Sequence, residues 1–176
     1  MITAVTLALT LAFEPAERNV MQRAPRDPKE PILSGFLIWR IIFVSLIIVT
    51  GTFGLFVWER ENGASIELAR TVAVNTLVMF EIFYLLSARY LLASALSREG
   101  LSGNRYVWYA IGLLLVIQLG FTYFGPMQTL FATTAMSVEA WLRVIVVASS
   151  VLVLVELEKM LLRQRHKKHP TGNRIS

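Results

Sequence analysis

Four blocks of apolar residues, each long enough to cross a lipid bilayer, constrain the fold of this chain more than any other feature. A spanning helix needs about 20 mostly apolar residues, because it rises 1.5 Å per residue through roughly 30 Å of hydrocarbon. The blocks lack the strict alternation of a membrane β-barrel, so helices are expected. The sequence therefore predicts an all-α fold, a polytopic transmembrane helical bundle, with full spans at 35–58, 68–92, 106–124 and 140–162.

A fifth block, residues 1–13, is apolar apart from threonines but makes a helix of only about 20 Å. It predicts a partial N-terminal span. Either it is a re-entrant or surface segment, or the real helix begins upstream and Met1 is an internal position. Thr3, Thr6 and Thr10 share one helical face. Their hydroxyls either bond back to their own helix or to a neighbouring one, or they line an ion path.

Composition excludes several classes of protein. Hydrophobic residues make up 55% of the chain and charged residues 16%, and the mean hydropathy is +0.58, so soluble and disordered chains are excluded. The net charge of +5 comes from basic residues between and after the apolar blocks, which is unlike a nucleic-acid-binding face. There is no cysteine, and we find no P-loop or dinucleotide fingerprint. We therefore expect no catalytic residue and no nucleic-acid partner.

The hydrophilic segments predict the orientation of the bundle. Residues 14–34 contain four prolines, which disfavour helix and indicate an extended connector. Basic residues are concentrated in this loop, near 93–105 and in the tail at 163–176. Because cytoplasmic loops carry the excess of Lys and Arg, the proline loop and the tail are expected in the cytoplasm.

Glu81 is the strongest candidate for function, because it lies near the middle of the span 68–92. A carboxylate at that depth costs about 2.5–3.5 kcal/mol on insertion scales and usually marks an ion or proton pathway. The alternative is a protonated Glu that hydrogen-bonds to a neighbouring helix.

Uncharged polar residues also occur at membrane depth. Asn75, Gln118, Ser149 and Ser150 are of the types that commonly hydrogen-bond between helices, and we expect that role for each of them.

Charged residues near the span ends predict snorkelling side chains. Glu156 and Lys159 are spaced as an i, i+3 ion pair. Arg40, Arg70 and Arg143 are expected to direct their guanidinium groups towards the membrane surface.

The proline loop carries a long motif at fixed offsets. It closely resembles the corresponding loop of the P-type ATPases of the calcium-pump group, with Phe13, Pro15, Met21, Arg23, Pro25, Arg26, Pro28, Glu30 and Pro31 at the matching positions. The resemblance implies that 1–13 is half of membrane helix six and that the full spans are helices seven to ten. It also implies that the loop couples the phosphorylation domain to the membrane, and that Thr3 and Glu81 match ion-site positions.

Two departures from that family matter. Calcium pumps carry a ligating aspartate where this chain has Ala4, which leaves a proton, a monovalent ion or another substrate open. The phosphorylation motif Asp-Lys-Thr-Gly-Thr is also missing. The resemblance implies that ATP and Mg act in the intact pump and that no cofactor binds this chain. Its implied partners are the lipid bilayer, the transported cation and the N-terminal part of the pump, with the phosphorylation, nucleotide and actuator domains and helices one to five.

The leading hypothesis is therefore a C-terminal membrane fragment of a P-type cation pump, in the plasma membrane of a bacterium. It would supply part of the ion site, through Glu81 (a tentative metal ligand), Thr3 and Asn75, together with the coupling loop. A free-standing membrane subunit or regulator of a transporter is the main alternative, and a relict with a structural role is a third.

Overall fold

The computed structural model describes residues 35–88 and 105–168. They form the helices α2 (Gly35–Glu61), α3 (Ile66–Ala88), α5 (Arg105–Tyr123), α6 (Gly125–Phe131) and α7 (Val138–Lys168). Within these residues, four helices are long and apolar enough to cross a membrane. The predicted all-α bundle with four full spans is confirmed. Residues 1–34, which include Thr3, Ala4 and the whole proline-loop motif, lie outside the described residues.

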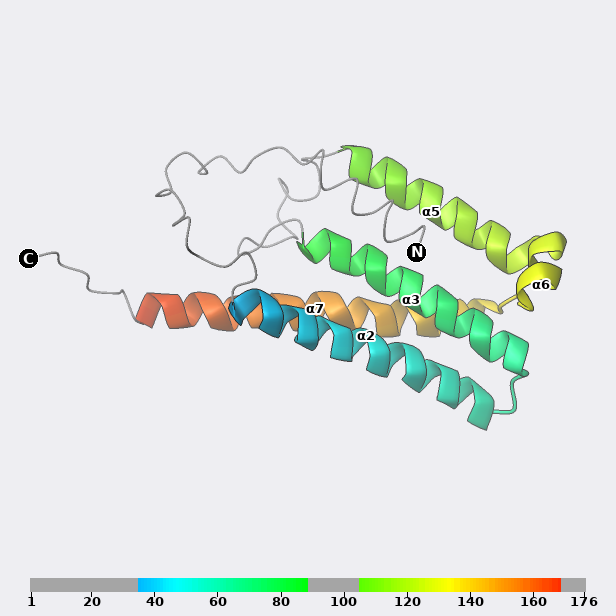
Figure 1. The fold of residues 1–176 in the computed structure, drawn as a ribbon, viewed down its shortest axis with the longest axis horizontal. Helices are drawn as coiled ribbons and strands as arrows, with labels where there is room; N and C mark the ends of the chain where they lie inside the picture. Colours follow the sequence, from blue (N-terminus) through cyan, green and yellow to red (C-terminus); the bar gives the residue numbers. More distant parts are fainter. Residues whose placement is uncertain (1–34, 89–104, 169–176) are drawn as a thin grey trace, which may run out of the picture.

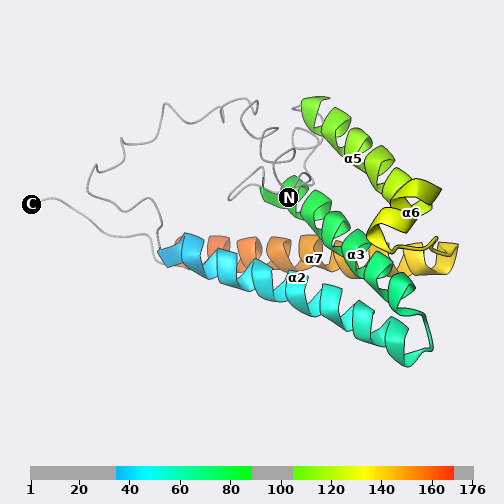
Figure 2. The same cartoon turned by 45° about the vertical axis from the view of Figure 1, so that its right-hand side comes forward.

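Helix α3 lies at the centre of the bundle. In Figures 1 and 2 it runs between α2 and α5, with α7 alongside α2 and α3. Its most apolar stretch is 56% buried, against 11% for α2 and 28% for α7. Most residues in the apolar stretches of α2 and α7 are therefore not buried within the described part of the chain.

A tight turn joins α2 to α3 and makes them antiparallel. Gly63 adopts a positive φ of 81°, a conformation that glycine tolerates best. The amide of Asn62 donates to the Trp58 carbonyl at 2.7 Å, which satisfies one carbonyl at the end of α2. At the start of α3, the Leu68 N–H donates to the Ser65 hydroxyl at 3.2 Å, as an N-cap does.

A buried stripe along α7 packs into the core against α3. Val144, Ala148, Val151 and Val155 are each no more than 1% exposed, and their spacing of four, three and four residues places them on one helical face. The stripe continues one turn further to Lys159, which is fully buried. A lysine thus occupies a position that the helical repeat assigns to the core.

Helices α2 and α3 approach closely at Gly51. A Cβ atom built at this position would lie 2.5 Å from the ring of Phe80 and 3.2 Å from the side chain of Val147. Phe80 is fully buried. The absence of a side chain at residue 51 therefore makes room for the largest buried ring of the core.

Helix α6 was not predicted. Residues 125–131 form it inside a segment that sequence reasoning treated as a loop, with a proline in its first turn. The left-handed residue Ala132 (φ 50°) follows it, and the Thr133 N–H donates to the Gln128 carbonyl at 3.1 Å. The other helices differ from the predicted spans at their ends. Helix α7 continues to Lys168, because a helix need not stop where the hydrocarbon does.

Candidate ion site

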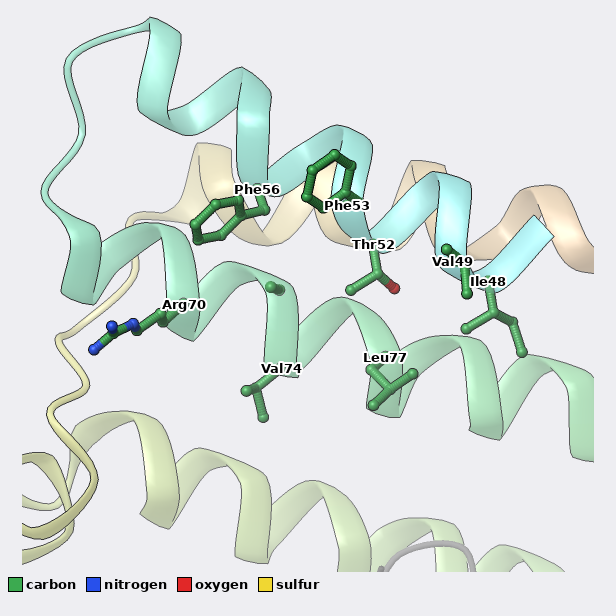
Figure 3. A pocket seen from close by; sticks show the side chains of 9 residues that line it. Ile48, Val49, Thr52, Phe53, Phe56, Arg70, Val74 and Leu77 are labelled. Carbon is green, nitrogen blue, oxygen red and sulfur yellow. The ribbon is translucent and has the colours of Figure 1, made fainter. Parts of the chain in front are cut away.

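Glu81 lies on the most exposed face of α3. Arg70, Val74 and Leu77 are exposed residues of this helix, and they recur with the i, i+4, i+7 spacing that Glu81 extends to i+11. We call these four residues the open face of α3. Figure 3 shows Arg70, Val74 and Leu77 following one another along it.

The open face borders a groove between α2 and α3 with a volume of about 490 Å³. Its walls are almost wholly apolar, and Thr52 contributes the one hydroxyl among its lining side chains. The hydroxyl oxygen of Thr52 is buried and has no hydrogen bond to any described residue. Within the described part of the chain, this side of α3 is thus less fully covered by other side chains than its packed sides are.

The carboxyl group of Glu81 has an oxygen atom that lacks a hydrogen-bond partner among the described residues. The residue is only partly exposed, and its Oε2 atom is buried with no hydrogen-bond partner among the described residues. An unpaired polar atom at membrane depth costs several kcal/mol. A group beyond those that the structure describes is needed to satisfy Glu81.

A complete cation site is not present in residues 35–88 and 105–168. No group of three or more His, Cys, Asp or Glu side chains converges there. Calcium takes six to eight oxygen ligands, so Glu81 would supply only a part of such a coordination shell.

Asn75 has a different environment. It is fully buried, and its amide nitrogen donates to the Thr71 carbonyl at 2.8 Å and to the Thr122 hydroxyl at 3.1 Å. The Thr122 hydroxyl can in turn donate to the Gln118 carbonyl at 2.9 Å. Asn75 therefore links α3 to α5, in the interhelical role that the sequence analysis expected.

The structure does not bring Asn75 and Glu81 together. Six residues separate them, so their side chains project about 120° apart around α3 at 3.6 residues per turn. Thr3, the third predicted site residue, lies outside the described residues. The shared site of these three residues stays a prediction.

The other polar residues at membrane depth differ in their hydrogen bonds. Gln118 is buried against the bundle, but its Nε2 atom has no partner among the described residues. The Ser149 hydroxyl donates to the Val146 carbonyl of its own helix at 2.8 Å. The prediction of an interhelical bond was therefore wrong for Ser149, because a short hydroxyl reaches the preceding turn more easily than another helix.

Arg40 corrects the expectation of snorkelling. Arg40 on α2 is 4% exposed and donates from Nε to Glu158 on α7 at 3.2 Å. Arg143 on α7 forms an ion pair with Glu59 on α2 at 2.7 Å. Each guanidinium pairs with a carboxylate of the antiparallel helix. The nearly buried Arg40 therefore does not direct its charge towards the surface.

The two ion pairs have opposite polarity at opposite ends of the α2–α7 contact. Arg40 and Glu59 are 19 residues apart along α2, which is about 28 Å of helix and close to the hydrocarbon thickness. A sliding of α2 along α7 would separate both pairs at once. They fix the register of the two helices.

Lys159 forms the predicted pair with Glu156, at 3.0 Å, but it does not snorkel. Its ammonium group also donates to the Ser87 carbonyl at 2.7 Å and contacts the Ser87 hydroxyl at 3.3 Å. Ser87 lies in the last turn of α3, where helix carbonyls attract a cation. Lys159 therefore ties α7 to the end of α3.

Comparison with known proteins agrees with this membrane architecture. Residues 1–161 match the protein family described as "Cation transporting ATPase, C-terminus". The match includes the predicted partial span and the proline-rich segment as well as the four long helices.

Individual relatives are similar along most of this chain. "Probable cation-transporting ATPase F" of Mycobacterium tuberculosis is 39% identical over 165 residues, which cover 94% of this chain and 18% of that protein. "Cation-transporting ATPase pma1" of Synechocystis is 34% identical and covers 80% of this chain and 16% of its own length. The human "Calcium-transporting ATPase type 2C member 1" is 35% identical, covering 91% and 17%.

The chain thus spans less than a fifth of the length of these relatives. The shared part is the membrane region in which Glu81 and the two ion pairs lie. With the family match over residues 1–161, this chain belongs to the C-terminal transmembrane region of the P-type cation-transporting ATPases.

Proposed function

We propose that this chain forms part of an ATP-driven cation pump and that Glu81 supplies one oxygen ligand to the transported ion. The observation that carries the proposal is the buried, unpartnered Oε2 atom of Glu81 on the open face of α3. A carboxylate held at membrane depth without an internal partner is suited to receive a cation or a proton.

The remaining ligands would come from other helices of the pump, which would cover the open face. ATP and Mg would act in its phosphorylation and nucleotide domains, and the proline loop would transmit their motion to the membrane. Thr3, on the partial span, would contribute a hydroxyl to the same site. Asn75 would support that site from the neighbouring flank of α3.

Ala4 affects the choice of ion. The human relative is named as calcium-transporting, so calcium is the first ion to test. A chain with Ala4 in place of the carboxylate that calcium pumps carry has one charged ligand fewer, and hard divalent cations favour carboxylates. We propose a pump with altered selectivity, for which monovalent cations and protons are tested beside calcium.

The test measures ATPase activity of the pump that carries this chain, as a function of ion concentration. With the ion that stimulates the wild type, Glu81→Gln is expected to raise the half-maximal concentration at least about tenfold, because it removes a charged ligand. Glu139→Gln is the matched control, since Glu139 is an exposed carboxylate in the first turn of α7. A wild-type ion dependence in Glu81→Gln would remove Glu81 from the site.

A further inference from the structure

A second groove lies between α2 and α7, close to the end of the bundle where α2 turns into α3. It has a volume of about 400 Å³ and is lined by Leu55, Trp58, Leu142, Arg143, Val146 and Val147. Four of the six are aliphatic, and Leu142 and Val146 are exposed. The groove thus offers an apolar channel along two helices that are long and apolar enough to span a membrane.

Arg143 stands at the rim of this groove in a fixed orientation. Its Nε and Nη2 atoms both donate to Oε1 of Glu59, at 3.2 and 2.7 Å. Its Cζ atom lies 4.5 Å from the centre of the Trp58 ring. A carboxylate on one edge and an indole on one face hold the guanidinium plane in place.

One edge of that guanidinium remains available. Nη1 makes no hydrogen bond to any described residue, and Nη2 uses one of its two protons for Glu59. The side chain of Arg143 is 31% exposed, whereas that of Glu59 is 5% exposed. The Nη1–Nη2 edge therefore presents two parallel N–H donors outward, the geometry that phosphate oxygens accept.

The depth of Arg143 agrees with a lipid headgroup. Trp58 lies three residues from the end of the span Leu37–Glu61, and tryptophan is enriched at the level of the headgroups. Below it, the groove continues into the hydrocarbon along Leu55 and Val146. A cationic donor at the interface above an apolar channel matches the two parts of a phospholipid.

We propose that this groove binds a phospholipid of the leaflet on the α2–α3 turn side of the membrane. Its phosphodiester accepts hydrogen bonds from Nη1 and Nη2 of Arg143, and one acyl chain lies along Leu55, Leu142 and Val146. Glu59 and Trp58 position the guanidinium.

In the experiment, the purified protein is placed in phosphatidylglycerol nanodiscs. A small fraction of the phosphatidylglycerol molecules carries a photoreactive group in the acyl chain. After illumination, mass spectrometry maps the labelled residues. We expect labelling of Leu142 and Val146 to exceed that of Val153 and Leu157, which are exposed positions elsewhere on α7.

Two variants test the groove separately. The double variant Glu59→Gln with Arg143→Gln avoids leaving a buried charge unpaired, and it should lower groove labelling about tenfold. Val146→Phe fills the channel and leaves the ion pair intact, and it should also abolish the excess labelling. Arg70→Gln, which changes an exposed arginine outside this groove, is the control and should change nothing there.

Three results would overturn the proposal. The first is groove labelling no higher than at Val153 and Leu157. The second is an excess that persists in both groove variants. The third is a co-purifying membrane protein that crosslinks to Leu142 and Val146 and excludes the lipid. Because the readout is lipid labelling, it is independent of whether the protein transports an ion.

Discussion

The polar groups on the packed sides of α3 and on its open face are satisfied differently. Thr71, Asn75, Thr76 and Ser87 are fully buried, and each has a hydrogen bond within the described chain. Glu81, on the open face, keeps a buried carboxyl oxygen without such a partner. Thr71, Asn75 and Ser87 link α3 to other parts of the chain, and Thr76 bonds within its own helix. The buried carboxyl oxygen of Glu81 makes no such contact within the residues that the structure describes. Within one helix, this difference distinguishes polar residues that stabilise the fold from the residue that we propose for ion binding.

Lys159 gives the most severe test of the packed side. Lys159→Met should lower the free energy of unfolding by about 3–5 kcal/mol, because it leaves Glu156 and the last turn of α3 without their buried cation. Reversible unfolding in mixed micelles measures the change. Met160→Leu, at the next and exposed position, should stay within about 0.5 kcal/mol. Equal effects of the two substitutions on the free energy of unfolding would show that the Lys159 contacts do not stabilise the fold.

Gly51 tests the close approach of α2 to the same side of the core. Gly51→Ala places a Cβ atom 2.5 Å from Phe80, so it should destabilise the protein by about 1–3 kcal/mol through overpacking. Gly54→Ala is the matched control on the same helix, since nothing lies within 4 Å of its Cβ position. The control should be neutral or stabilising by up to about 1 kcal/mol. The account would be wrong here if both alanines had the same effect in the unfolding assay.

Asn75 has the smallest expected effect and sharpens the comparison with Glu81. In a double-mutant cycle, Asn75→Leu and Thr122→Val should show a coupling energy of about 0.6 kcal/mol, the average for hydrogen bonds between membrane helices. The effect of Asn75→Leu on the ion dependence of ATPase activity should be far smaller than that of Glu81→Gln. A large loss of apparent ion affinity without coupling to Thr122 would instead assign Asn75 to the ion site.

Local sequence patterns were sufficient to predict the four long helices. Length and apolar content are properties of a segment, and they locate a span without knowledge of its neighbours. The predicted ends of the helices were less accurate. Helix α6 was missed because seven residues that begin with Gly-Pro and are followed by a left-handed alanine give too weak a signal.

Contacts between distant residues were not predictable in the same way. Arg40 meets Glu158 across 118 residues of sequence and Arg143 meets Glu59 across 84. Each arginine by itself has the sequence signature of a snorkelling side chain. The rotation of α3 that directs Asn75 to α5 and Glu81 to the open face also depends on packing. The sequence predicted the helix on which each of these residues lies but not the direction in which its side chain points.

The most direct test of the central claim is the stabilisation of the pump by its transported ion, in wild type and in Glu81→Gln. A ligand at 100 times its dissociation constant stabilises the folded protein by about 2.7 kcal/mol. If Glu81 is an ion ligand without a structural role, Glu81→Gln should unfold like the wild type without the ion and should lose most of this stabilisation when the ion is added. A variant that is less stable without the ion, yet fully stabilised by it, would contradict the account and make Glu81 a structural residue.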